Sequence, residues 1–405
     1  MGELTMNVIF LSPNFPLHFY NFCNRLKALG CNVLGIGDCP YDNLNNNVKS
    51  SLTEYYYVNS LEDYDQVMRA AAFFTFKYGK INHIESQNEY WLKTQSRLRE
   101  DFNVENGIRL DGLEKVKLKS KMKTGYAKAG IKTARWLLID SQGKAKKFAK
   151  AVGFPVIIKP DNGVGASNTY KINDLSELDD VLNKIDCQNK VNIIEEFVPG
   201  HVETFDGITD KDGNILFCTG QVMKITPLAM LNGNGENISF TTDMQHSDLL
   251  EIGTKAVKAF NVKQTFFHFE FFRLDESKDG LGEKDEIIGL EVNMRAPGGY
   301  IPDKMNYAYD VDVYQIWAES LVFNENRSFK NYEFKRFVTH YGRGANVSYR
   351  NSAEEIRQKF GDRLLLENIP PKSISGGMGA QIFILKSLSI KQLEEDGDYI
   401  LEKNN

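Results

Sequence analysis

The sequence has no long apolar run and no surplus of positive charge. No segment approaches the roughly 18 to 20 apolar residues that a transmembrane helix needs. The 405 residues carry a formal net charge of -5, which argues against nucleic acid as the main partner. The N-terminal stretch contains Glu3 and is interrupted by Pro13, so it does not resemble a secretion signal. We therefore expect a cytoplasmic protein that acts without a membrane.

Cysteine is scarce, and two common nucleotide motifs are missing. The chain has five cysteines and no CxxC pair, which is typical of packed thiols in a reducing compartment. No GKS or GKT follows a glycine-rich loop, so there is no P-loop. The loop PNFP, after the first predicted strand, has no glycine to cradle a dinucleotide. The sequence therefore predicts neither a P-loop nor a nicotinamide site.

The pattern of strand and helix signals along the sequence predicts an α/β chain with three regions. The first, up to about residue 112, opens with a strand at MNVIFLS, a helix at FYNFCNRLKALG and a strand at CNVLGIGD, which is a βαβ start. The second, to about 325, begins with one basic helix at LEKVKLKSKMKTGYAKAG and continues mainly in strands. The third, from about 326, carries short strand signals such as GAQIFILKS.

The stretch LEVNMRAPGG places polar side chains inside an apolar strand. Successive side chains of a strand point to opposite faces, so one face should carry Glu291, Asn293 and Arg295. The other face should carry Leu290, Val292 and Met294. Burying an acid, an amide and a guanidinium without partners costs several kcal/mol each. The polar face therefore needs a partner.

A second strand, TFFHFEFFRL, carries the isolated acid Glu270 on the same face as His268. Alone, such an acid is more often one half of an internal salt bridge. Beside Glu291 and Asn293, however, it completes a set of hard oxygen ligands. Mg²⁺ prefers such oxygens and takes phosphates and water as its other ligands. The strands therefore predict a site for Mg²⁺, or Mn²⁺, bound together with a triphosphate.

The stretch FPVIIKPDNGVGAS supplies groups that suit phosphate. Lys159 ends an apolar strand, and Gly163 and Gly165 allow a tight turn that aims backbone N–H groups at an anion. The hydroxyl of Ser167 adds a donor. About half of isolated glycine loops are plain turns, and the lysine immediately before this one strengthens the phosphate interpretation.

Taken in order, these motifs resemble the ATP-grasp fold of carboxylate–amine ligases, biotin carboxylase and D-alanine–D-alanine ligase. GFPVIIKPDNGVGAS resembles their lid strand and loop, IIEEFVPGHVE their adenine hinge, and HFEF with GLEVNMRAPGG their metal motif. The resemblance implies an α/β (α+β grasp) protein with a Rossmann-like N-terminal domain (1–112), an ATP-grasp domain (113–325, mobile lid at about 130–195) and a small β-rich C-terminal domain (326–405). Leu118, Lys123 and Asn168 depart from the residues most frequent in the family.

The resemblance also implies a role for each motif. Position alone does not distinguish Lys119 from its lysine neighbours in the basic helix, but the resemblance selects it, with Lys159, for the α- and β-phosphates. Residues 163–167 would fold over the β- and γ-phosphates. Glu195 or Glu196 and the backbone of Phe197 and Val198 would hold adenine, and Glu203 the ribose. The implied cofactor-binding residues are Lys119, Lys159, Gly163, Gly165, Ala166, Ser167, Glu195, Glu196, Phe197, Val198 and Glu203.

Glu270, Glu291 and Asn293 are the implied metal ligands. Arg295 is the implied catalytic residue, because its rigid fork can stabilise a transferring phosphoryl group or clamp a substrate carboxylate. Other side chains carry less of the prediction. Tyr300, Tyr307 and Tyr309 belong either to the substrate pocket or to the core, and no role is assigned to His18, His201 or His268.

The predicted function is an ATP-dependent ligase that joins a small carboxylate to an amine through an acyl-phosphate, releasing ADP and phosphate. An amino acid or dipeptide ligase fits best, and family habit predicts a homodimer. One alternative keeps the fold and carboxylates biotin with bicarbonate. The other is a nucleotide-binding module without catalysis, which the complete set of metal and phosphate residues disfavours.

Overall fold

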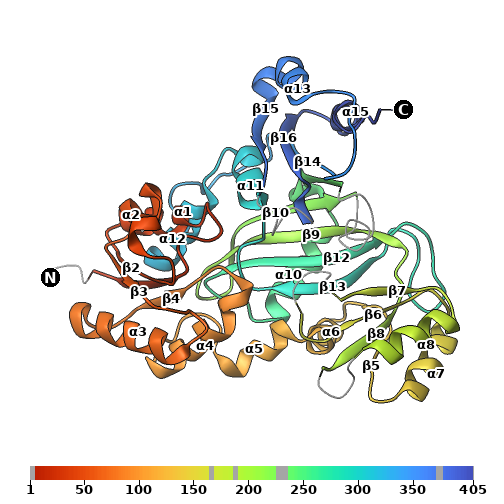
Figure 1. The fold of residues 1–405 in the computed structure, drawn as a ribbon, viewed down its shortest axis with the longest axis horizontal. Helices are drawn as coiled ribbons and strands as arrows, with labels where there is room; N and C mark the ends of the chain where they lie inside the picture. The colour runs from red at the N-terminus through yellow and green to blue at the C-terminus, as the bar shows by residue number, and fades with distance from the viewer. Residues whose placement is uncertain (1–4, 164–167, 186–189, 225–235, 371–376, 405) are drawn as a thin grey trace.

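The structure is a computed structural model that describes residues 5–163, 168–185, 190–224, 236–370 and 377–404. Its N-terminal region is a four-stranded parallel sheet in the order β3-β2-β1-β4 (Figure 1). Every residue of β1 is buried, as expected of a parallel strand covered on both faces. The elements are β1 Asn7–Leu11, α1 Tyr20–Ala28, β2 Asn32–Gly37, α2 Asn46–Ser51, β3 Glu54–Tyr57, α3 Tyr64–Tyr78, β4 His83–Glu85 and α4 Leu92–Asp101.

The centre of the molecule is an eight-stranded antiparallel sheet in the order β13-β12-β9-β10-β11-β14-β16-β15. One face packs its phenylalanines, including Phe205, Phe269 and Phe271, into a core shared with α6 and α10. The strands are β9 Gly200–Thr209, β10 Ile215–Met223, β11 Asn237–Thr242, β12 Phe266–Leu274, β13 Ile287–Asn293, β14 Phe337–Arg343, β15 Leu364–Asn368 and β16 Gln381–Ser387. The last three strands come from the C-terminal region, so the sheet continues across the predicted boundary at residue 325.

A third sheet forms the lid region, in the order β5-β8-β6-β7. It lies at the opposite end of the central sheet from the N-terminal region (Figure 1). Two amphipathic helices cover one face and bury a small core around Val156, Ile158 and Leu178. The elements are β5 Trp136–Leu138, α7 Gln142–Val152, β6 Val156–Pro160, β7 Tyr170–Ile172, α8 Leu175–Lys184 and β8 Asn192–Glu196.

The remaining helices join these sheets. In a small aromatic cluster, Phe22 of α1 meets Tyr314 and Trp317 of α12 with ring centroids 4.9 and 5.1 Å apart. The helices are α5 Leu110–Lys117, α6 Lys119–Lys128, α10 Leu249–Ala259, α11 Ile301–Tyr309, α12 Val313–Phe323, α13 Ala353–Phe360 and α15 Ile390–Ile400. Short 3-10 turns occur at Tyr41–Asn43, Glu89–Trp91, Met244–His246 and Gly361–Arg363. Of the helices described, none is both long and apolar enough to cross a bilayer.

The basic run after residue 112 was predicted as one helix, and this is wrong. The chain breaks at Leu118, whose ψ of 120° is extended, and α6 begins at Lys119. The break arises because Asp161, in the lid, satisfies the start of α6: its carbonyl accepts from the Lys119 N–H at 2.9 Å and its carboxylate from the Ser120 N–H at 2.7 Å. The break fixes Lys119 at the first turn of a helix that faces the lid.

Candidate active site

A cavity of about 300 Å³ lies between the lid sheet and the central sheet. Its wall combines apolar side chains, including Ile157 and Phe272, with most of the residues predicted for the site. These are Lys119, Lys159, Glu195, Glu196, Phe197, Val198, Glu270, Glu291, Asn293 and Arg295. Gly163 lies beside them, because its carbonyl accepts a hydrogen bond from Lys119 Nζ at 2.8 Å. Gly165, Ala166 and Ser167 lie outside the described residues.

Strands β12 and β13 bring the two carboxylates face to face. Glu270 is in register with Glu291, and His268 with Asn293. A β-bulge interrupts the ladder immediately after Glu270, where Phe271 pairs with Gly289 and Leu290 becomes the extra residue. The prediction that Leu290 lies on the core face is therefore wrong: it lines the cavity together with Glu291.

The bulge is held by a buried tyrosine. Tyr126 of α6 is fully buried, and its hydroxyl donates to the backbone carbonyl of Glu291 at 3.0 Å and lies 3.4 Å from that of Glu270. A side chain at position 289 would come within 2.8 Å of the Tyr126 ring, so the bulge needs Gly289. The geometry of the two acidic strands thus depends on this glycine–tyrosine contact.

The charges around the two acids differ. Burial and the facing Glu270 raise the pKa of Glu291, although Lys119 opposes the rise. Burial would also raise the pKa of Glu270, but the hydrogen bond and charge of His268, 3.2 Å from Glu270 Oε1, lower it. Burial likewise acts against the charged form of His268, yet its contact with the buried Asp206 raises its pKa to about 10. The side chains of Asp206, His268 and Glu270 therefore form a row of negative, positive and negative charge. The carboxylate of Glu291 lies next to the last member of this row.

This donor set fits a magnesium ion bound with a nucleotide. Two carboxylates in register and an amide oxygen two residues away are hard ligands on one face of a sheet. Their mutual repulsion, visible in the raised pKa of Glu291, is relieved by a divalent cation. Among the described residues no group of three or more His, Cys, Asp or Glu side chains could enclose a metal. An ion held by Glu270, Glu291 and Asn293 would complete its coordination with water or phosphate oxygens.

One buried lysine and one partly buried lysine line the cavity together with the acids. Lys119 is 4% exposed, and Lys159 reaches Glu195 at 3.1 Å. Lys123, which departs from the family pattern, is also buried and lies 3.3 Å from the other oxygen of Glu195. Burial acts against the charge of Glu195, but these two lysines lower its pKa. The buried Glu195 thus pairs with the buried Lys123 and holds the partly buried Lys159 at the cavity wall.

Ion pairs and hydrogen bonds limit which groups of the predicted adenine hinge could contact a base. The carboxylate of Glu196 accepts from the Arg135 N–H at 2.7 Å and pairs with its guanidinium at 2.6 Å. Lys278 donates to the Phe197 carbonyl at 2.5 Å. The carboxylates of Glu195 and Glu196 are thus already taken by cations. Contacts to a base would fall to the hinge backbone and to the apolar wall.

The structure does not place Glu203 with the other predicted residues. Its neighbour Val202 lines the cavity, so Glu203 points to the opposite face of β9. There its two oxygens accept from Arg273 at 2.9 Å each, and Arg273 continues to Asp248 at 2.7 Å. His201 joins the same network, 3.4 Å from Glu203. The predicted ribose contact of Glu203 is therefore wrong, because the carboxylate lies across the sheet from the cavity.

Arg295 lies where this cavity meets a second one, of about 430 Å³. Its guanidinium donates to Glu89 of the N-terminal region at 2.7 Å and to the carbonyl of Ala296 at 2.8 Å. Its Nε is buried and has no acceptor among the described residues. Tyr300 and His18 line the second cavity, whereas Tyr309 is buried in the core and Tyr307 is 37% exposed.

Sequence reasoning missed several residues that complete the site. Asp206 and Tyr126 contact the two acidic strands, Lys123 pairs with Glu195, and Glu89 pairs with Arg295. Lys123 could have been identified from the sequence, because it departs from the residue most frequent in the family at this position. Glu89 carried none, because it meets Arg295 across 206 positions of sequence.

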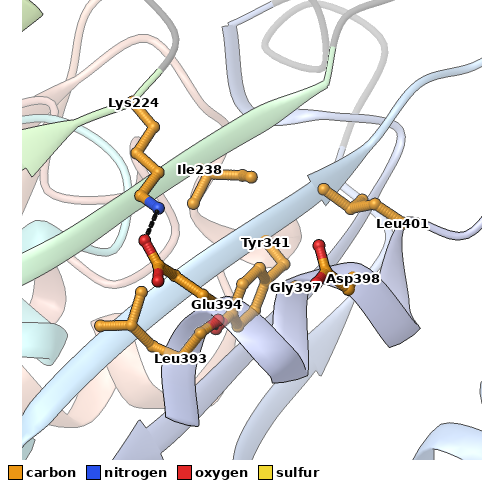
Figure 2. Close-up of a pocket in the computed structure, with 8 residues that line it drawn as sticks. All are labelled: Lys224, Ile238, Tyr341, Leu393, Glu394, Gly397, Asp398 and Leu401. Carbon is orange, nitrogen blue, oxygen red and sulfur yellow. Dashed lines mark hydrogen bonds and ion pairs between the residues drawn. The ribbon is translucent and has the colours of Figure 1, made fainter. Parts of the chain in front are cut away.

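A further cavity, of about 480 Å³, lies between α15 and the central sheet (Figure 2). Its lysine, Lys224, is paired with Glu394 at 2.7 Å, and none of the predicted site residues lines it. The size of this cavity alone therefore does not indicate a nucleotide-binding site.

Comparisons with known sequences agree with this geometry. A family model described as ATP-grasp domain matches residues 124–296. The L-arginine-specific L-amino acid ligase of Bacillus subtilis is 28% identical over 268 residues, which are 63% of this chain and 60% of that protein. The carbamoyl phosphate synthase large chain of Thermotoga maritima is 24% identical over 196 residues, which are 47% of this chain and 17% of that protein. The chain thus matches less than two thirds of the length of either relative.

Solved structures share the fold over almost the whole chain. The L-amino acid ligase from Bacillus licheniformis has a TM-score of 0.72 at 16% identity and covers 99% of this chain and 100% of that one. The biotin carboxylase from Campylobacter jejuni has a TM-score of 0.68 at 12% identity, covering 97% and 90%. The predicted α/β fold class is confirmed. The match of residues 124–296 to the ATP-grasp domain model confirms the predicted resemblance to the ATP-grasp superfamily.

Proposed function

We propose that the protein is an ATP-dependent ligase that joins a carboxylate to an amine and releases ADP and phosphate. The observation that carries this proposal is the position of Arg295. It lies between a cavity whose lysines and carboxylates suit a nucleotide with Mg²⁺ and a second cavity that opens onto the N-terminal sheet. A phosphoryl group can therefore pass from one cavity to a substrate in the other at this arginine.

The first cavity would bind ATP. The hinge backbone at Phe197 and Val198 and the apolar wall would hold adenine, and Lys119 and Lys159 would neutralise the inner phosphates. Glu270, Glu291 and Asn293 would hold Mg²⁺, or Mn²⁺, against the outer phosphates. A bound divalent cation supplies charge neutralisation at the β- and γ-phosphates.

The reaction would take place in two displacements. A carboxylate oxygen of the acid attacks the γ-phosphorus, an O–P bond forms, and the bond from that phosphorus to the β-bridging oxygen breaks to release ADP. The amine nitrogen then attacks the acyl carbon, the C–N bond forms, and phosphate leaves with the electrons of the C–O bond while the amine loses a proton. Arg295 stabilises the charge at the transferring group, and the protein acts mainly by positioning.

The relatives guide the choice of substrates. Two of them are named as amino acid ligases, so we propose an amino acid or a similar small acid as the carboxylate and a second amino acid as the amine. One solved neighbour is a biotin carboxylase domain dimer with bound MgADP. A homodimer remains the predicted assembly here.

The test is phosphate release from ATP in the presence of paired amino acids, with a matched pair of variants. Glu291→Gln removes one carboxylate from the cavity and should lower turnover at least a hundredfold while the core face of β13 stays intact. Glu203→Gln makes the same change across the sheet and should retain turnover. Near-normal turnover by Glu291→Gln would show that the acidic pair is not the metal site.

A further inference from the structure

The second cavity lies at the carboxyl edge of the N-terminal parallel sheet. It is lined by residues 15–19, which follow β1, and residues 87–90, which follow β4. In the order β3-β2-β1-β4 the chain progresses in opposite directions on the two sides of β1, so β1 and β4 flank a switch point. Open α/β sheets bind ligands in the crevice at such a point. The cavity is therefore placed as a small-molecule site.

The described residues of this cavity wall offer no unpaired charge to the side chain of a substrate. Among its described residues the charged ones are Glu89 and Arg295, and they pair with each other at 2.7 Å. Burial lowers the pKa of His18 to about 4, so its imidazole is neutral near pH 7. A basic or acidic side chain would lose its hydration here and find no unpaired counter-charge.

Instead, the wall offers apolar surface. Phe19 and Tyr300 lie inside, with Met378 beside them. At the rim Phe15 is 44% exposed and Leu17 64% exposed. A ligand with an apolar body would remove this surface from water, which is the general driving force for filling such a crevice.

We propose that this cavity holds the body of the carboxylate substrate, and that this body is aliphatic or aromatic, as in leucine, methionine or phenylalanine. The carboxylate would accept a hydrogen bond from the Arg295 Nε–H, which is buried and has no acceptor among the described residues, and the side chain would lie against Phe19, Tyr300 and Met378. The inference rests on the proposed function and names its acid. It separates this chain from its arginine-specific relative, because a guanidinium would meet apolar groups and a carboxylate already paired.

The experiment measures ADP formation with a series of amino acids as the acid, at a fixed concentration of alanine as the amine. Leucine, methionine and phenylalanine should give values of kcat/KM at least tenfold above those for arginine, lysine, glutamate and aspartate. Leu17→Glu places a carboxylate at the rim and should lower kcat/KM for methionine at least tenfold while raising the use of arginine relative to methionine. Leu388→Glu, at an 81% exposed position in the C-terminal region, is the matched control and should leave both values unchanged.

Calorimetry separates this inference from the proposed reaction. In the presence of ADP and Mg²⁺, 4-methylpentanoate, the deamino analogue of leucine, should bind to the natural protein and at least tenfold more weakly to Leu17→Glu. Such binding without ADP formation by any acid would support the cavity assignment and overturn the ligase. ADP formation that favours a charged acid and ignores Leu17→Glu would overturn the cavity assignment and support the ligase. No binding of 4-methylpentanoate and no ADP formation with any acid would overturn both.

Discussion

The buried ion pair between Arg99 and Glu85 should determine both the stability of the protein and the position of Arg295. Arg99 donates to Glu85 at 2.8 Å and to the carbonyl of Ile84 at 2.6 Å, and Arg99 and Glu85 are 2% and 3% exposed. Gln87 continues the chain of contacts: its amide donates to Glu85 at 3.1 Å, and its oxygen accepts from the Ala296 N–H at 2.9 Å. Arg99 is thus linked through buried hydrogen bonds to the residue that follows Arg295.

The change Arg99→Met keeps an apolar stem and removes the cation. It leaves the carboxylate of Glu85 buried and uncompensated, and breaking such a pair costs about 3 to 5 kcal/mol. We therefore expect the free energy of unfolding to fall by about that amount in urea titrations followed by circular dichroism. We also expect kcat/KM to fall at least tenfold, because Glu85, which orients Gln87 toward Ala296, would lose the cation that holds it in place.

A double variant shows whether charge is the cause. Glu85→Gln combined with Arg99→Met removes both charges and should recover at least about 1 kcal/mol relative to Arg99→Met alone. The reasoning fails if Arg99→Met costs less than about 1 kcal/mol, or if the double variant is no more stable than the single one.

Three smaller predictions follow from other contacts. Tyr126→Phe leaves the Glu291 carbonyl without its hydroxyl donor, so it should destabilise the protein by about 1 to 3 kcal/mol and weaken Mn²⁺ binding measured by EPR; unchanged binding would remove the tyrosine from the metal site. Burial, with the charge of Arg99, lowers the pKa of His83 from 6.5 to about 4. Between pH 6.5 and about 4 the unfolded chain therefore binds more protons than the folded protein, so the stability of the protein should fall as the pH drops through this range. His83→Asn should reduce this loss of stability, measured as the change in melting temperature with pH. Glu203→Gln should destabilise the protein by about 1 to 3 kcal/mol through Arg273, and a tenfold rise in KM for ATP would return Glu203 to the nucleotide site.

The alternation of residues along one strand was sufficient to predict which side chains share a face of that strand. The alternation of Glu291, Asn293 and Arg295 predicted their common face, and the structure gathers them on one cavity wall. The same alternation placed Leu290 wrongly, because period two assumes an unbroken ladder. The bulge depends on the contact between Gly289 and Tyr126, which are far apart in the chain.

The order of motifs along the chain was a weaker guide to the role of a residue whose direction depends on a neighbouring strand. Glu203 follows the hinge at a distance in sequence that resembles family members, but its direction is fixed by the register of β9 with β12 and by Arg273. Similarly, the break at Leu118 depends on Asp161 in the lid, and Glu89 reaches Arg295 from the N-terminal region. Such contacts arise from tertiary packing, which no local pattern encodes.

The measurement that tests the central claim most directly is the identity of the nucleotide product, determined by chromatography after turnover with an apolar amino acid and alanine. Arg295, whose charge acts on the carboxylate of Glu270, lines both cavities, whereas Lys119 and Lys159 line the first cavity alone. Transfer of the γ-phosphoryl group should therefore give ADP and phosphate. Hydroxylamine added with the acid, in place of the amine, should trap the acyl-phosphate as a hydroxamate. AMP and pyrophosphate as the main products would contradict the account, whichever acid and amine are used.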